Sequence, residues 1–83
     1  MAKKVLGKIT HYFGKISVAV VELKGTIKKG ETISIEGPTT NFKQTVGSMQ
    51  IEHRPIETAK KGQAIGMKVA EKVREGDEVF RES

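Results

Sequence analysis

Glycine residues divide the chain into short segments, and this spacing constrains the fold more than any other feature of the sequence. Nine glycines are spread over 83 residues, and apolar and polar residues alternate between them, as in 32–36 and 64–69. Because a period of two places every second side chain on the same face of a strand, these segments predict strands that are buried on one face. We therefore expect an all-β fold.

We expect six or seven short strands, with turns every eight to twelve residues. The strand segments lie at 5–13, 16–23, 27, 32–36, 42–52, 64–69 and 79–80. Gly47 marks a possible bulge within 42–52, and residues 56–60 could form one short helical turn. This arrangement predicts a closed barrel of the Greek-key type, because closure removes exposed strand edges. Residues 1–83 would form a single domain.

The segment 16–23 is apolar on both of its faces. Ile16, Val18 and Val20 share one face, and Ala19 and Val21 lie on the other. A strand with one solvent-exposed face would carry polar residues at alternate positions. We therefore expect this strand to be covered on both sides at its far end.

The chain contains no cysteine, which excludes disulfide bonds, thiolate zinc sites and thiol catalysis. A fold of 83 residues must then be stabilised by its apolar core alone. The longest apolar run, 18–21, is far shorter than the roughly 20 residues that span a bilayer. No signal-type apolar region follows Lys3 and Lys4. We expect a soluble, cytoplasmic protein with no membrane partner.

The net charge of +5 comes entirely from the first half of the chain. Residues 1–44 contain eight basic and three acidic residues, and residues 45–83 contain seven of each. An excess of positive charge that is confined to one part of the chain favours an acidic partner such as nucleic acid. Abundant Lys and Glu, with few Asp, Asn and Gln, are typical of proteins from heat-loving organisms.

Basic and aromatic residues together form the candidate binding site. Lysines neutralise phosphates and aromatic rings stack on bases, as RNA recognition requires. The candidate RNA-binding residues are Lys3, Lys4, Lys8, His11, Tyr12, Lys15, Lys28, Lys29 and Lys43. The alternative is that the lysines keep the surface soluble and Tyr12 covers a barrel rim. For Phe42 and Phe80 we favour a place in the core.

Two glycine-lysine pairs raise the question of nucleotide binding. Gly7-Lys8 and Gly14-Lys15 lack the glycine four residues earlier and the directly following Ser or Thr of a phosphate loop. We therefore expect no nucleotide hydrolysis.

Candidate catalytic and metal-binding residues are few. Ser48, His53 and Asp77 have the residue types of a hydrolytic triad, but the chain has no nucleophile elbow. His11 and His53, with Glu52, could bind zinc, but their spacing does not favour a metal. We expect a protein that is not an enzyme, with no metal and no cofactor.

Several segments resemble the second domain of translational GTPases such as elongation factor Tu. They are Ile27-Lys28-Lys29-Gly30-Glu31-Thr32-Ile33, 59–67 and Arg74-Glu75-Gly76-Asp77-Glu78-Val79. Three further segments, 10–13, 37–40 and 48–53, resemble small free-standing translation-factor-like barrels and the C-terminal barrel of collagenase-like peptidases. The resemblance implies a translation-protein barrel, a fold that docks on ribosomal or transfer RNA in the factors.

Two functions follow as hypotheses. The first is a non-enzymatic, translation-factor-like module whose basic N-terminal face contacts the ribosome or structured RNA. The alternative is an accessory barrel that binds a protein partner or substrate, related to the C-terminal domain of collagenase-like peptidases. Fold alone does not decide between them.

Overall fold

The computed structural model describes residues 4–52 and 54–81, and all of its regular elements are strands. No helix in these ranges could cross a membrane. The strands are β1 (Lys4–Phe13), β2 (Val18–Leu23), β3 (Ile27–Lys28), β4 (Thr32–Glu36), β5 (Asn41–Thr45), β6 (Met49–Ile51), β7 (Arg54–Ile56), β8 (Thr58–Ala59), β9 (Ala64–Lys68) and β10 (Glu78–Arg81). The all-β prediction is confirmed.

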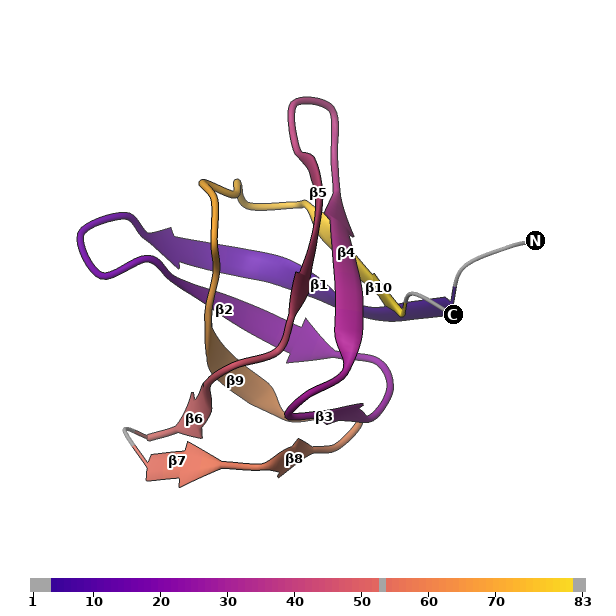
Figure 1. Ribbon diagram of the computed structural model, residues 1–83, viewed down its shortest axis with the longest axis vertical. Helices are drawn as coiled ribbons and strands as arrows, with labels where there is room; N and C mark the ends of the chain where they lie inside the picture. The colour runs from indigo at the N-terminus through magenta and orange to yellow at the C-terminus, as the bar shows by residue number, and fades with distance from the viewer. Residues whose placement is uncertain (1–3, 53, 82–83) are drawn as a thin grey trace.

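Eight strands form one curved antiparallel sheet in the order β5-β4-β10-β1-β2-β9-β6-β7, and β3 pairs with β8 in a small second sheet (Figure 1). The terminal strands β5 and β7 do not pair with each other in the described residues. The sheet is therefore an open half-barrel, and the prediction of a closed barrel of six or seven strands is wrong.

Two local differences explain the strand count. The segment 42–52 is not one strand with a bulge, because it leaves the ladder at 46–48 and separates into β5 and β6. The segment 56–60 is not helical, because Ile56 still pairs with Met49 and Ala59 pairs with Ile27. Tertiary pairing thus overrides the weak local preference of these short segments.

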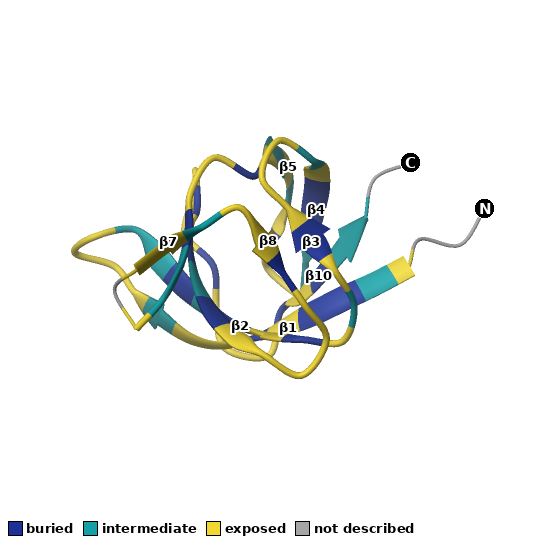
Figure 2. Ribbon diagram, turned by 90° about the horizontal axis from the view of Figure 1, so that it is seen from below, coloured by how far each residue is buried: buried dark blue, intermediate teal, exposed yellow. Residues whose placement is uncertain are grey.

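Alternation along the strands builds the core on the concave side of the sheet. Figure 2 shows that the buried segments lie along the strands and that the connections are mostly exposed. The buried apolar residues are Leu6, Ile9, Ala19, Val21, Leu23, Ile27, Ile33, Ile35, Val46, Met49, Ala59, Ile65, Met67, Val69, Val73 and Val79. Phe42 is partly buried and packs against this cluster, as predicted, and Phe80 is half-buried.

A bulge in β1 determines which of its side chains face the core. Ile9 pairs with Val21, but the next paired residue, His11, is opposite Val20. The extra residue is Thr10, whose hydroxyl Oγ1 donates to the Val20 carbonyl oxygen at 3.3 Å. Because a bulge shifts the alternation by one position, His11 and Phe13 lie on the outer face of the sheet.

The same shift turns Tyr12 inward. Tyr12 pairs with the fully buried Ala19 and packs against the core.

The two ends of the described chain lie side by side. Lys4, the first residue of β1, pairs with Arg81, the last residue of β10. The β1–β2 tip lies on the opposite side of the molecule from the start of β1 and the end of β10 (Figure 1). Nine residue steps separate Lys4 from Phe13, so the tip is about 30 Å from the ends at a strand rise of about 3.3 Å per residue.

Gln44 bridges the open seam of the half-barrel. Its side-chain Nε2 donates to the Lys68 carbonyl oxygen at 3.0 Å, and its Oε1 accepts from the Ala70 backbone N–H at 2.8 Å. These two bonds imitate the exchange of bonds between paired residues of neighbouring strands. One amide side chain therefore connects β5 to the end of β9, where no backbone ladder is present.

Replacing Gln44 with alanine is expected to lower the free energy of unfolding by about 1–2 kcal/mol, because two hydrogen bonds across the seam are lost. Urea unfolding followed by circular dichroism measures the change. Thr45→Ala, at an exposed neighbouring position on the same strand, should have a smaller effect. Equal stability of the Gln44→Ala protein and the wild type would show that the seam contributes nothing.

Candidate functional site

A groove on the outer face of the sheet is the most distinctive surface feature. We call it the outer groove. It has a volume of about 200 Å³ and is lined by Phe13, Ile16, Val18, Val20, Gln50, Glu52 and Gly66. Most of its lining residues are apolar, although they lie on the side of the sheet that faces away from the core. The groove is therefore an apolar surface that the described fold does not cover.

Strand register determines the floor of the outer groove. Gly66 on β9 is opposite Val20 on β2 and opposite Gln50 on β6. A Cβ atom at Gly66 would lie 3.3 Å from Val18 Cγ1 and 3.6 Å from Gln50 Cγ. Because glycine places no side chain there, the sheet is hollowed between β2 and β6.

The rim of the outer groove exposes two large apolar side chains. Phe13 is 46% exposed and Ile16 is 60% exposed. The Phe13 ring contacts the His11 ring, with centroids 4.5 Å apart and planes tilted by 59°. Exposed apolar side chains that gather around a hollow are typical of interaction sites.

Left-handed backbone flanks the outer groove on both sides. Ser17, in the β1–β2 turn, has φ 54°, and Glu52, after β6, has φ 51°. The Ser17 carbonyl oxygen accepts from the Val69 N–H at 2.9 Å, which ties the hairpin tip to the end of β9. Non-glycine residues in this region of φ are uncommon and concentrate at functional sites. Among the described residues that line the groove, Glu52 is also the only ionisable one.

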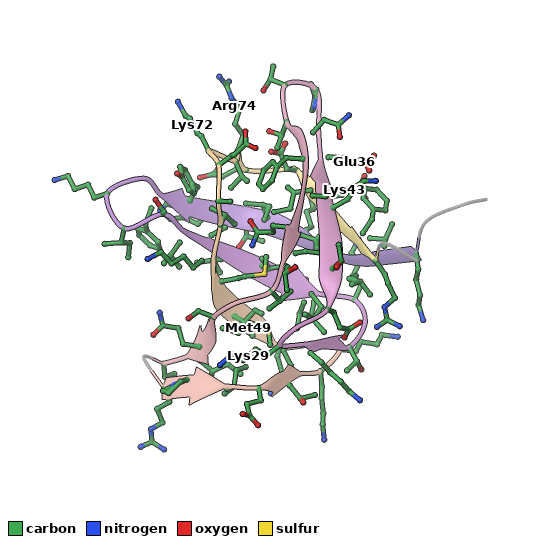
Figure 3. The ribbon with its side chains drawn as sticks, in the orientation of Figure 1. Lys29, Glu36, Lys43, Met49, Lys72 and Arg74 are labelled. Carbon is green, nitrogen blue, oxygen red and sulfur yellow. The ribbon has the colours of Figure 1, made fainter. Side chains whose placement is uncertain are left out.

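The predicted basic site is spread over the molecule. Lys4 starts β1, and Lys15 lies in the turn at the far end of that strand. Lys28 is the last residue of β3, Lys29 follows it, and Lys43 on β5 pairs with Ser34 in the middle of β4 (Figure 3). Lys3 lies outside the described residues. The structure therefore does not bring the candidate lysines together at one place.

Carboxylates offset some of this positive charge. Lys8 pairs with Glu22 on β2 and with Glu78 on β10, so two acidic residues share its face of the sheet. His11 Nδ1 lies 3.3 Å from Glu75 Oε2. The positive charge at these positions is thus partly compensated by neighbouring carboxylates, of which Glu75 and Glu78 come from the second half of the chain.

The candidate triad and zinc residues are not assembled. Asp77 is 2% exposed, and its Oδ2 accepts from the Arg74 N–H at 2.9 Å, so it stabilises the turn before β10. Ser48 is exposed between β5 and β6, and His53 lies outside the described residues. Within 4–52 and 54–81, no three His, Cys, Asp or Glu side chains group in a way that could hold a metal.

Fold and site together define a small all-β domain with an apolar surface groove and no assembled catalytic centre among its described residues. The chain belongs to the peptidase family U32 C-terminal domain family, whose model matches residues 2–78. This finding agrees with the collagenase-like part of the sequence resemblance. It does not show the translation-factor part, so RNA binding through the basic residues stays a prediction.

Two related proteins illustrate the family. The chain is 45% identical over 76 residues to an uncharacterized protease of Methanocaldococcus jannaschii, covering 90% of this chain and 19% of that protein. It is 40% identical over 81 residues to a collagenase of Porphyromonas gingivalis, covering 95% of this chain and 22% of that protein. The chain therefore spans about a fifth of the length of these relatives.

A solved structure shows the same fold. The C-terminal domain of a protein described as a U32 peptidase of Geobacillus thermoleovorans superposes with a TM-score of 0.90 at 18% identity, covering 95% of this chain and all of that domain. A second structure of that domain gives a TM-score of 0.89 at 19% identity.

The outer groove was not among the sites expected from the sequence. The relevant pattern is in 16–23, where apolar residues occupy both faces and predict a strand that is covered on both sides at its far end. The described part of the fold covers only one face. A strand that is apolar on both faces in so short a chain therefore also indicates a binding surface.

Proposed function

We propose that this chain is a non-catalytic accessory domain of a U32 peptidase-family protein and that it docks an extended protein segment in its outer groove. The observation that carries the proposal is the exposure of Phe13 and Ile16 around the hollow above Gly66. Burial of such side chains against a partner provides about 25 cal/mol per Å² of apolar surface.

Size and position support a protein segment as the ligand. A volume of about 200 Å³ is smaller than the roughly 300–1,000 Å³ of small-molecule sites, but it accepts a side chain of a peptide. Phe13 and Ile16 of the groove rim belong to the β1–β2 tip, which lies on the opposite side of the molecule from the start of β1 and the end of β10 (Figure 1). Two relatives are named collagenases, which suggests a protein substrate.

Replacing Ile16 with aspartate is expected to lower the affinity for denatured collagen by at least about tenfold, because a charge is placed on the apolar rim. Biolayer interferometry on immobilised gelatin measures the affinity. Thr32→Asp introduces the same charge at an exposed position on β4, and it should leave binding unchanged.

Two outcomes would contradict the proposal. One is an Ile16→Asp protein that binds gelatin as well as the wild type. The other is no binding of gelatin together with salt-dependent binding of ribosomal RNA, which would favour the RNA-binding hypothesis.

A further inference from the structure

The outer groove is electrically asymmetric along the strands that form it. Glu52 lies at one end, and no ion pair joins it to another described residue. Toward the other end, Lys68 pairs with Val18, so its side chain leaves the sheet on the groove side. The apolar floor at Gly66 lies between these two charges, because Gly66 is two residues before Lys68 on β9.

From this arrangement, and resting on the proposed function, we infer that the outer groove selects segments in which an apolar side chain is flanked by Lys or Arg. The apolar side chain occupies the hollow above Gly66, between Val18, Val20 and Phe13. The neighbouring cation pairs with the Glu52 carboxylate. Segments that carry acidic residues beside the apolar one are disfavoured, because Glu52 lines the groove and Lys68 does not, so repulsion of an acidic residue at Glu52 outweighs its attraction to Lys68.

The turn after β6 fixes the position of Glu52 at the end of the outer groove. The φ of 51° at Glu52 directs the chain through a tight turn directly after β6. Asn or Gly adopts this conformation at lower cost than glutamate. The hairpin accounts for this φ, because Ile51 pairs with Arg54 and hairpin turns this short favour a positive φ at their first residue. The turn thereby holds the exposed Glu52 at the mouth of the apolar groove.

Three short probes test the inference directly. They are the acetylated and amidated peptides Gly-Ser-Lys-Phe-Lys-Ser-Gly, the same peptide with both Lys replaced by Glu, and the same peptide with Phe replaced by Ser. Nuclear magnetic resonance titration of the ¹⁵N-labelled chain reports the site and the affinity. Lysines on both sides of Phe make the result independent of the direction in which the peptide binds.

We expect the Lys-Phe-Lys peptide to shift the amide signals of Val20, Gln50 and Gly66. The Glu-Phe-Glu peptide should bind at least about threefold more weakly, the effect of an exposed ion pair. The peptide without Phe should not bind. Glu52→Gln should remove the preference between the two Phe peptides, whereas Lys68→Glu should keep it or increase it.

Gly66→Val provides a second, independent variant. Valine suits the interior of a strand, and Gly66 has no positive φ, so the variant should fold; its side chain fills the hollow and should abolish binding of every probe. Its thermal unfolding and amide spectrum verify the fold.

The outcomes separate the two proposals. Equal affinity of both Phe peptides, or a preference that survives in Glu52→Gln, overturns the charge selection and leaves docking intact. Absence of binding, or shifts confined to another face, overturns the inference. If the wild-type chain binds the peptides but does not bind gelatin, that result contradicts the proposed binding of denatured collagen and leaves the charge selection intact.

Discussion

Replacing Gly37 with alanine is expected to destabilise the domain by about 2–3 kcal/mol, which lowers the midpoint of thermal unfolding by roughly 10–20 °C. A Cβ at Gly37 would overlap Oδ1 of Asp77 and lie 2.7 Å from its Cγ. Asp77 cannot move away freely, because it is 2% exposed and holds the Arg74 N–H at 2.9 Å. Calorimetry of the purified chain measures the change.

A matched glycine and a double variant make this prediction specific. Gly47→Ala places its Cβ where no atom lies within 4 Å, so it should leave stability nearly unchanged. Asp77→Ala removes the group that obstructs Gly37→Ala, and the double variant should be less destabilised than the sum of the two single changes. Additive effects would show that the contact between the two residues is not the cause.

Replacing Met67 with alanine is expected to cost about 2–5 kcal/mol, because it leaves a cavity in the centre of the core. Met67 is fully buried and lies between Ala19 on β2 and Met49 on β6. The relatively small Ala19 leaves the space beside it to the long Met67 side chain, so the neighbours cannot easily fill the gap. Urea unfolding measures the loss in the free energy of unfolding, provided that its dependence on urea concentration (the m-value) is the same for both proteins.

Met67→Leu is the control for this second change. It conserves volume closely enough that we expect a cost below about 1.5 kcal/mol. A Met67→Ala protein as stable as the Met67→Leu protein would contradict the assignment of Met67 to the centre of the core.

The alternation of apolar and polar residues predicted the strands well, because burial of one face of a strand requires an apolar residue at every second position. Thr32–Glu36 and Ala64–Lys68 appear almost as expected. The order of the strands was not accessible in this way, because β10 pairs with both β1 and β4 across long connections. The open seam could not be predicted from the alternation of apolar and polar residues. Gln44 crosses the seam with hydrogen bonds of its side chain, and such bonds produce no periodic pattern in the sequence.

The candidate site was harder to predict than the fold. The basic site was predicted from the excess of lysines in residues 1–44. The local charge depends instead on neighbours across the strands, such as Glu22 and Glu78 beside Lys8. Tyr12 was expected to stack on bases, yet the bulge at Thr10 turns it toward the core and leaves Phe13 on the outside. One inserted residue in a strand moves each later side chain of that strand to the opposite face of the sheet. No single residue type predicts such an insertion.

The pairing of Lys4 with Arg81 has a mechanical consequence. A polypeptide joined to either end of the described domain would be attached at the same side, about 30 Å along β1 from the outer groove at the strand rise given above. The domain would therefore act as a rigid arm whose length, rather than the linker alone, sets where a captured segment is held. Lengthening the linker would widen the volume that the groove can search and lower the effective concentration of the captured segment at a fixed point of the attached protein.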